Sequence, residues 1–144
     1  MNTVGSGDFL TDLMQFLFDF AFSQGFGVAQ ISKDEEYRPL ADKTRNLIII
    51  NTNWKNKSEL PFIIGHEIGH LMDGDVGLSY YCGNALTSKE HHADLYSLNL
   101  IFDYATRQYD CFNEPSEFMR AYGIPVRMYD SMVELFRKHN DLLF

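Results

Sequence analysis

The strongest strand signal in the sequence is followed closely by an apolar helix that carries ionisable side chains. Residues 47–50 read Leu-Ile-Ile-Ile and lie between Asn46 and Asn51, which is typical of a strand bounded by polar residues. Because this run is apolar on both faces, we expect helices to cover it. A polar turn separates it from residues 58–73, which are rich in Ile, Phe and Leu. This strand and helix predict a folded domain with a substantial core.

Local signals mark the two ends of that helix. Ser58 is a candidate N-cap, because its hydroxyl can accept a hydrogen bond from a free backbone N–H. Pro61 falls in the first turn, where a missing N–H is tolerated. Gly74 follows Asp73 and is expected to end the helix.

The rest of the chain is predicted to be mostly helical. Apolar residues recur at three-and-four spacing from residue 9 to 22, which indicates an amphipathic helix. The other expected elements are a strand at 28–31, loops at 33–36 and 74–87, and helices at 87–102, 114–122 and 126–139. The buried stripe of the last helix is expected to comprise Tyr129, Met132, Val133 and Phe136. We therefore predict a compact α+β fold in one domain, 1–144, mostly helical with a small β-sheet packed on helix 58–73.

Charge and composition exclude several classes of protein. Twelve Lys and Arg against twenty Asp and Glu give a net charge of −8, which argues against direct nucleic-acid binding because phosphate is held by clustered basic side chains. No uncharged run approaches the roughly 18 residues of a membrane span, and no export signal is found. We expect a cytoplasmic protein without membrane contact. Cys82 and Cys111 are too few for a disulfide framework.

Helix 58–73 contains the motif His-Glu-x-x-His at residues 66–70. Two histidines one helical turn apart lie on one face, so both imidazoles of His66 and His70 can reach a single ion. Zn²⁺ suits imidazole and carboxylate ligands and keeps an open position when it is catalytic. Glu67 projects beside the two histidines and is predicted to act as the general base that activates a water. The alternative is a helix with two histidines of no chemical role.

The third ligand is expected on the next helix. Asp73 and Val76 occupy the positions where metzincins carry a glycine and a third histidine, so that class is excluded. Glu90 and Asp94 lie four residues apart on one face. Glu90 is predicted to bind the metal, and Asp94 to receive the other ring N–H of a ligand histidine. The competing interpretation is a capping box in which Glu90 bonds the Thr87 backbone.

Other residues near these motifs are candidates for a role in the site or in packing. Tyr80 and Tyr81 are candidate oxyanion stabilisers, although packing is the alternative for both. Close approach of a neighbouring backbone would explain Gly65 and Gly69 within a helix. Cys82 is expected to be a buried, inert thiol rather than a ligand. Three further histidines, His91, His92 and His139, are expected at the surface, and the alternative for His91 or His92 is a role as a substitute metal ligand.

The segment from about 46 to 102 resembles the ImmA/IrrE metallopeptidases. The resemblance rests on the strand 46–51, the sequence Gly-His-Glu-Ile-Gly-His at 65–70, and Glu-His-His-Ala-Asp at 90–94. Tyr96 and Ser97 depart from the family's usual Phe-Ala. The resemblance implies a zincin-like domain that uses one zinc ion. It also implies site-specific cleavage of a regulatory protein, often a helix-turn-helix repressor in bacteria, phages or other mobile elements.

Residues 119–126 have the sequence pattern of a helix-turn-helix, with a glycine turn between two helices. A DNA-reading second helix would need an excess of basic residues, whereas Arg127 and its basic neighbours are matched by acidic ones. We interpret the segment as a packing pair of helices.

The leading hypothesis is a zinc-dependent endopeptidase acting on a DNA-binding transcriptional repressor, with substrate bound along an edge of the sheet that contains residues 47–51. A second hypothesis is a non-proteolytic binding module, such as an antirepressor or toxin–antitoxin partner, that keeps the zinc fold. The third is a structural helical domain without metal.

Overall fold

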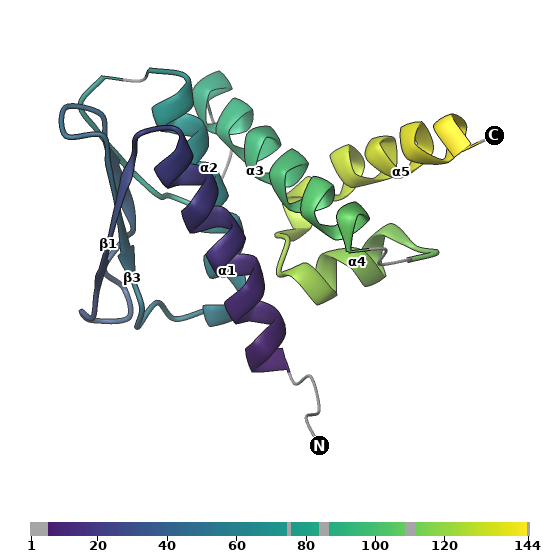
Figure 1. Ribbon diagram of the computed structural model, residues 1–144, viewed down its shortest axis with the longest axis horizontal. Coiled ribbons are helices and arrows are strands. Elements are labelled where there is room, and N and C mark those ends of the chain that lie inside the picture. Colours follow the sequence, from purple (N-terminus) through teal and green to yellow (C-terminus); the bar gives the residue numbers. More distant parts are fainter. Residues whose placement is uncertain (1–5, 75, 84–86, 109–111, 144) are drawn as a thin grey trace.

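The computed structural model describes residues 6–74, 76–83, 87–108 and 112–143 (Figure 1). The elements in chain order are α1 (Ser6–Ser23), β1 (Gly27–Ile31), β2 (Leu40–Asp42), β3 (Leu47–Asn51), the 3₁₀ turn η1 (Lys57–Glu59), α2 (Leu60–Met72), β4 (Leu78–Tyr80), α3 (Ser88–Arg107), α4 (Pro115–Tyr122), the 3₁₀ turn η2 (Val126–Met128) and α5 (Tyr129–Leu143). The predicted α+β class, mostly helical with a small sheet, is confirmed. No helix in the described ranges is long and apolar enough to cross a membrane.

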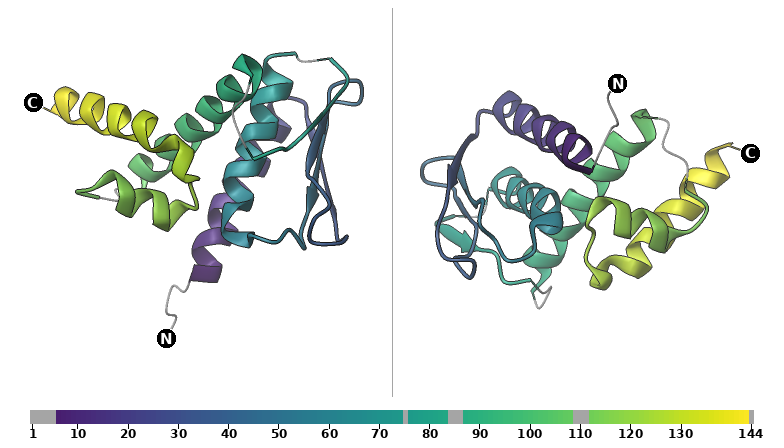
Figure 2. Two further views of the ribbon diagram at one scale, coloured as in Figure 1. Left: turned by 180° about the vertical axis from the view of Figure 1, so that it is seen from behind. Right: turned by 90° about the horizontal axis from the view of Figure 1, so that it is seen from below.

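The four strands form one mixed sheet in the order β1-β3-β2-β4. Strand β1 runs parallel to β3, whereas β2 is antiparallel to both β3 and β4. Helices α1 and α2 lie on the same side of this sheet (Figures 1 and 2). Ile48 and Ile50 are fully buried, but Leu47 and Ile49 are only half-buried. The expectation that helices cover β3 holds for one face only, because α1 and α2 lie on the same side of the sheet.

Two short strands were not predicted. Strand β4 lies inside the segment expected to be a loop, and β2 follows Pro39 closely. Each spans three residues, which is too short for an alternating pattern to be recognised. They exist because β2 pairs with β3 on one side and β4 on the other, so partners distant in sequence satisfy their backbone groups.

The start of α2 differs from the sequence expectation. Ser58 does not cap the helix, since it lies in η1 and its hydroxyl donates to Asn56 Oδ1 at 2.8 Å. Glu59 is the N-cap residue, and Pro61 falls in the first turn as predicted. The helix ends just before Gly74, whose φ of +72° requires a left-handed backbone.

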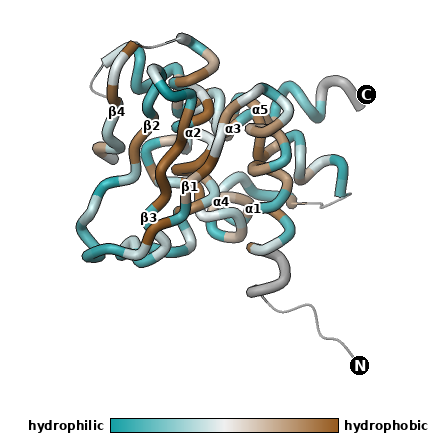
Figure 3. The backbone as a smooth tube through the Cα atoms, turned by 60° about the vertical axis from the view of Figure 1, so that its left-hand side comes forward, coloured by the Kyte–Doolittle hydropathy of each residue, from teal (hydrophilic) through white to brown (hydrophobic). Residues whose placement is uncertain are grey.

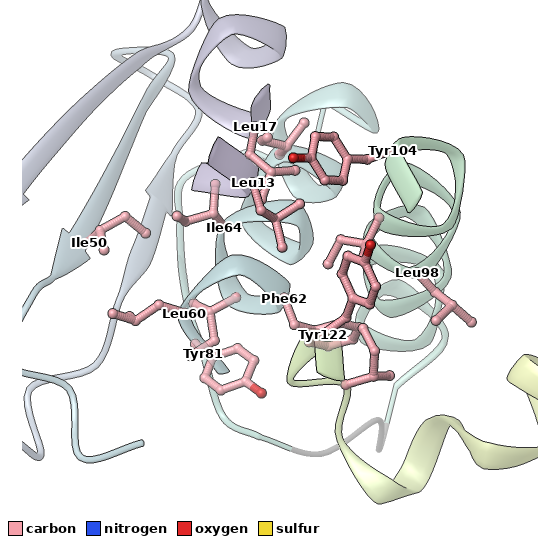
Figure 4. Packing of buried hydrophobic residues seen from close by; sticks show 14 of the residues in the cluster. Leu13, Leu17, Ile50, Leu60, Phe62, Ile64, Tyr81, Leu98, Tyr104 and Tyr122 are labelled. Carbon is pink, nitrogen blue, oxygen red and sulfur yellow. The ribbon is translucent and has the colours of Figure 1, made fainter. Parts of the chain in front are cut away.

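Helices α2 and α3 pack with their backbones close together. A Cβ at Gly65 would lie 2.3 Å from Ser97 Oγ, and one at Gly69 would lie 3.0 Å from the Cα of Ala93. The close approach expected at the two glycines is confirmed. Figure 3 shows hydrophobic colour along β3 and α2, and Figure 4 shows the cluster of buried side chains to which α1, α2 and α3 contribute.

The helix pair α4–α5 docks against the start of α2 through its turn. Gly123 has φ +67°, and a Cβ there would lie 1.8 Å from the carbonyl oxygen of Ser58. The predicted stripe of α5 is partly wrong: Met132 is buried, but Tyr129 and Val133 are 47% and 39% exposed. The turn η2 precedes the helix and directs Met128 inward instead.

Candidate metal centre

His66, His70 and Glu90 come together where α2 packs on α3. Their ligand atoms all lie within 4.8 Å of one another. His66 Nε2 is 3.1 Å from His70 Nε2 and 3.5 Å from Glu90 Oε1, and Glu90 Oε2 contacts His70 Nε2. Both histidines are buried, and the Glu90 side chain is 14% exposed. The structure thus brings together the three residues that the sequence indicated as ligands.

The donor set fits a zinc ion. Two imidazole nitrogens and one carboxylate oxygen are ligands that zinc prefers, at roughly 2.0–2.2 Å each. Ligand atoms at those distances around a tetrahedral ion lie roughly 3–4 Å apart. The separations of 3.1 Å between the ring nitrogens and 3.5 Å from His66 to Glu90 match this spacing. These three residues would hold the ion and leave a fourth position open.

Asp94 lies on the outer side of His66, one helical turn after Glu90. Its Oδ1 is 2.8 Å from His66 Nδ1, and its side chain is fully buried. Burial acts to lower the pKa of His66, but the hydrogen bonds with Asp94 and Glu90 outweigh it and raise the pKa to about 9. Burial acts to raise the pKa of Asp94, and the bonds with His66 and Arg127 lower it overall. The two neighbouring carboxylates therefore favour the protonated form of His66 when no metal is bound.

Glu67 is buried and lacks a hydrogen-bond partner within the described part of the chain. Neither carboxylate oxygen has one, and the residue is 0% exposed. Burial raises the pKa of Glu67 well above its ordinary value; nearby His66 opposes this rise, and Glu90 adds to it. An unpaired buried carboxyl group is costly, so its presence beside three metal-type ligands suggests a use in chemistry rather than in packing.

Glu90 takes part both in the cap of α3 and in the cluster of candidate metal ligands. Thr87 is the N-cap of α3, and its Oγ1 accepts the Glu90 backbone N–H at 3.2 Å. The Glu90 carboxylate faces the two histidines, and Cys82 Sγ donates to its Oε1 at 3.3 Å. Burial acts to raise the pKa of Glu90, and the interactions with His66 and His70 lower it overall. Only half of the predicted capping box is formed, because its carboxylate is taken by the histidines.

The remaining sequence candidates fall in different places. Cys82 is exposed rather than buried, so that expectation is wrong, and Cys111 lies outside the described residues. His91 and His92 are exposed, as expected. His139 is half-buried, with its ring 5.6 Å from that of Phe102, because α5 turns this position toward α3.

Of the two tyrosines, Tyr81 lies beside the site. It is 2% exposed, and its ring centroid is 5.3 Å from that of His66 in an edge-on arrangement. Its hydroxyl donates to Glu59 Oε1 at 3.0 Å and accepts from Arg127 Nη2 at 3.2 Å. Tyr80 is 49% exposed on β4. The Tyr81 hydroxyl is engaged with Glu59 and Arg127, whereas its ring packs against a candidate ligand.

Sequence reasoning missed Arg127 as a residue of this site. The guanidinium of Arg127 binds both carboxylate oxygens of Asp94, although 33 positions separate the two residues. No motif spacing links them. The available signal was chemical: a buried carboxylate needs a counter-charge.

A buried HExxH helix and a glutamate from the next helix define the ligand arrangement of a metal-dependent peptidase. In agreement, the model of Peptidase family M48 matches residues 44–92. The matched segment is about a third of the chain and contains α2 with all of its candidate residues, together with Glu90. M48 peptidases are metal-dependent, so this likeness supports a metallopeptidase. No curated protein and no solved structure matches the chain.

Proposed function

We propose that the protein is a zinc-dependent endopeptidase. The observation that carries the proposal is the unpartnered, buried carboxyl group of Glu67 next to the converging His66, His70 and Glu90. The sequence similarity to M48 peptidases supports the same class of activity. The resemblance to ImmA/IrrE peptidases, carried by the motifs at 65–70 and 90–94, suggests the finer assignment.

Each residue of the site has a distinct task in this proposal. His66, His70 and Glu90 hold the zinc ion, which when bound polarises the scissile carbonyl and lowers the pKa of a water. Glu67 takes a proton from the attacking water and passes it to the leaving amine. A C–O bond forms as the C–N bond breaks, and Glu67 ends in its starting protonation state. The raised pKa of Glu67, caused first by burial, makes its carboxylate a stronger base and so favours the first of these two transfers.

The free edge of β4 is the proposed binding surface for an extended substrate. Strand β3, at the centre of the prediction, is paired on both sides, and β1 and β4 are the outer strands of the described sheet. The chain passes from β4 directly into Tyr81 and Cys82, which contact His66 and Glu90. A peptide that adds to β4 by backbone hydrogen bonds would therefore run toward the metal ligands. Leu78 and Tyr80, both about half exposed, would flank it.

The proposed substrate is a DNA-binding transcriptional repressor in the cytoplasm of a cell that carries a phage or another mobile element. The ImmA/IrrE resemblance supports this class of substrate. The net charge of −8 favours association with a basic partner, because opposite charges steer encounter.

The decisive variant is Glu67→Gln, which keeps the shape of the side chain and removes the base. Repressors encoded beside the gene are co-expressed with either form, and fragments are resolved on a gel. We expect fragments with the wild type only, a loss of at least about a hundredfold in rate, and unchanged zinc content. Cleavage by the variant at the wild-type rate contradicts the mechanism. Relief of repression by that variant without any fragment would instead establish the non-proteolytic binding module.

A further inference from the structure

The guanidinium of Arg127 joins three segments around the candidate metal centre. From η2 its Nε and Nη2 donate to Asp94 Oδ2 and Oδ1 at 2.9 and 3.0 Å. Nη1 donates to the carbonyl oxygen of Gly83 at 3.0 Å, and Nη2 also reaches the Tyr81 hydroxyl at 3.2 Å. Its plane lies over the ring of Phe62, 5.5 Å from the centroid. Arg127 thus contacts α2, α3 and the segment after β4.

The bidentate contact of Arg127 with Asp94 fixes the orientation of the carboxylate and also neutralises its charge. Asp94 is 0% exposed, so water cannot solvate its charge or supply the hydrogen bonds that its oxygens require. A bidentate guanidinium holds both oxygens in one plane. In that plane Oδ1 is shared between Arg127 Nη2 and His66 Nδ1. Rotation of the carboxylate would break both contacts with Arg127.

The orientation of Asp94 in turn determines where the other nitrogen of His66 points. With Nδ1 held at 2.8 Å from Asp94, the ring directs Nε2 toward His70 and Glu90, at 3.1 and 3.5 Å. A histidine that binds metal through one nitrogen is oriented by the partner of the other. Arg127 acts one step further from the ion than Asp94.

We propose that Arg127 is a positioning residue of the metal centre, holding Asp94 so that His66 presents Nε2 to the ion. This inference rests on the proposed function, since it requires that His66 bind metal. It gives the C-terminal helix pair a role in the site: Gly123 packs against the Ser58 backbone, and this seats η2 with Arg127 against the start of α2.

The test measures zinc affinity by competition with a chromophoric chelator, using the full chain. Arg127→Met removes the guanidinium group but keeps apolar contact with Phe62 and Tyr81. Arg127→Lys keeps the charge but offers a point donor in place of the planar fork. The matched control is Arg107→Met, which removes an arginine that pairs with Asp103 on the surface of α3 at 2.9 Å.

We expect Arg127→Met to weaken zinc binding on the order of 10–100-fold, as loss of an outer partner of a ligand does. Arg127→Lys should recover part of this loss, and Arg107→Met should bind as the wild type does. A purely structural role predicts a different pattern, in which Arg127→Met lowers the melting temperature of metal-free and zinc-loaded protein equally and leaves the affinity unchanged. That pattern would overturn the inference.

A double-mutant cycle with Asp94→Asn tests whether Arg127 acts through Asp94. If it does, Arg127→Met should weaken zinc binding far less in the Asp94→Asn background than in the wild type. Equal losses in both backgrounds would refute this route. A wild type that binds no stoichiometric zinc would remove the proposed function. Zinc binding and cleavage that are insensitive to Arg127→Met would remove only the positioning role.

Discussion

At the scale of single residues, the site is an arrangement of charges that burial makes costly unless each is balanced. His66 is 1% exposed and Asp94 0%, and each stabilises the ionised form of the other. Glu67 is the exception, since neither of its oxygens has a partner among the described residues. A paired group such as His66 is suited to holding an ion, whereas the unpartnered carboxyl group of Glu67 is suited to moving a proton.

The ionisation of His66 predicts how the stability of the metal-free protein depends on pH. The pKa of His66 is about 9 in the folded chain, against an ordinary value of 6.5, so the folded state holds the proton more tightly. This contribution, a few kcal/mol at most, is complete below about pH 6.5 and is lost as pH rises through 9. Chelator-treated protein should therefore unfold at lower urea concentration at about pH 9.5 than at about pH 6.5.

Zinc-loaded protein is the control for this prediction, because a histidine that binds metal cannot also carry the proton. Its stability should change less over the same range. A metal-free protein with equal stability at both pH values would show that His66 is not protonated in the fold.

At the scale of elements, the site depends on how closely α2 approaches α3. Glycine normally weakens a helix by about 1 kcal/mol relative to alanine, yet α2 contains Gly65 and Gly69. Their missing side chains allow the α3 backbone to lie against α2. Glu90 and Asp94 can reach the histidines because of this contact.

Gly65→Ala is expected to destabilise the protein by about 1–3 kcal/mol, as overpacking of a core does, despite the better helix propensity of alanine. The added Cβ would lie 2.3 Å from Ser97 Oγ and 2.9 Å from its Cβ. In a Ser97→Gly background both atoms are absent, so the same substitution should cost less. Urea unfolding of the four proteins in this cycle measures the difference, and equal costs would show that the side chain of Ser97 is not the obstacle.

At the scale of the whole molecule, the turn between α4 and α5 is one of the places where the C-terminal helices contact the peptidase-like part, besides ring contacts with α3. Gly123 is the residue at this junction, with φ +67° and the Ser58 carbonyl where a side chain would begin. Arg127 follows four residues later and reaches Asp94. The segment that resembles a helix-turn-helix in sequence therefore packs against the site.

Gly123→Ala should be more destabilising than Gly25→Ala, although both replace glycines with a positive φ. Gly25 has φ +85° and nothing within 4 Å of an added Cβ, so its substitution carries only the backbone cost of about 1–2 kcal/mol. At Gly123 the Cβ would meet Ser58 O at 1.8 Å, which forces the turn away from η1. Thermal unfolding compares the two variants, and equal losses would indicate a loosely docked helix pair.

Much of the fold and the candidate ligands could be predicted because their signals are local. Residues 47–50 indicate a strand through their unbroken apolar run, and residues 58–73 indicate a helix through their apolar content and boundary residues. HExxH places His66 and His70 on one face by helical geometry alone. The prediction of Glu90 as a ligand required a motif that extends over two helices. In the structure its carboxylate lies close to both histidines.

Tertiary structure alone decided the remaining features, because they depend on partners far away in the chain. Strand β4 is held by β2, Cys82 is exposed beside Glu90, and the inward face of α5 is set by the docking of its preceding turn. Arg127 meets Asp94 because burial of that carboxylate demanded a cation, and only the folded chain determines which one is close enough to provide it.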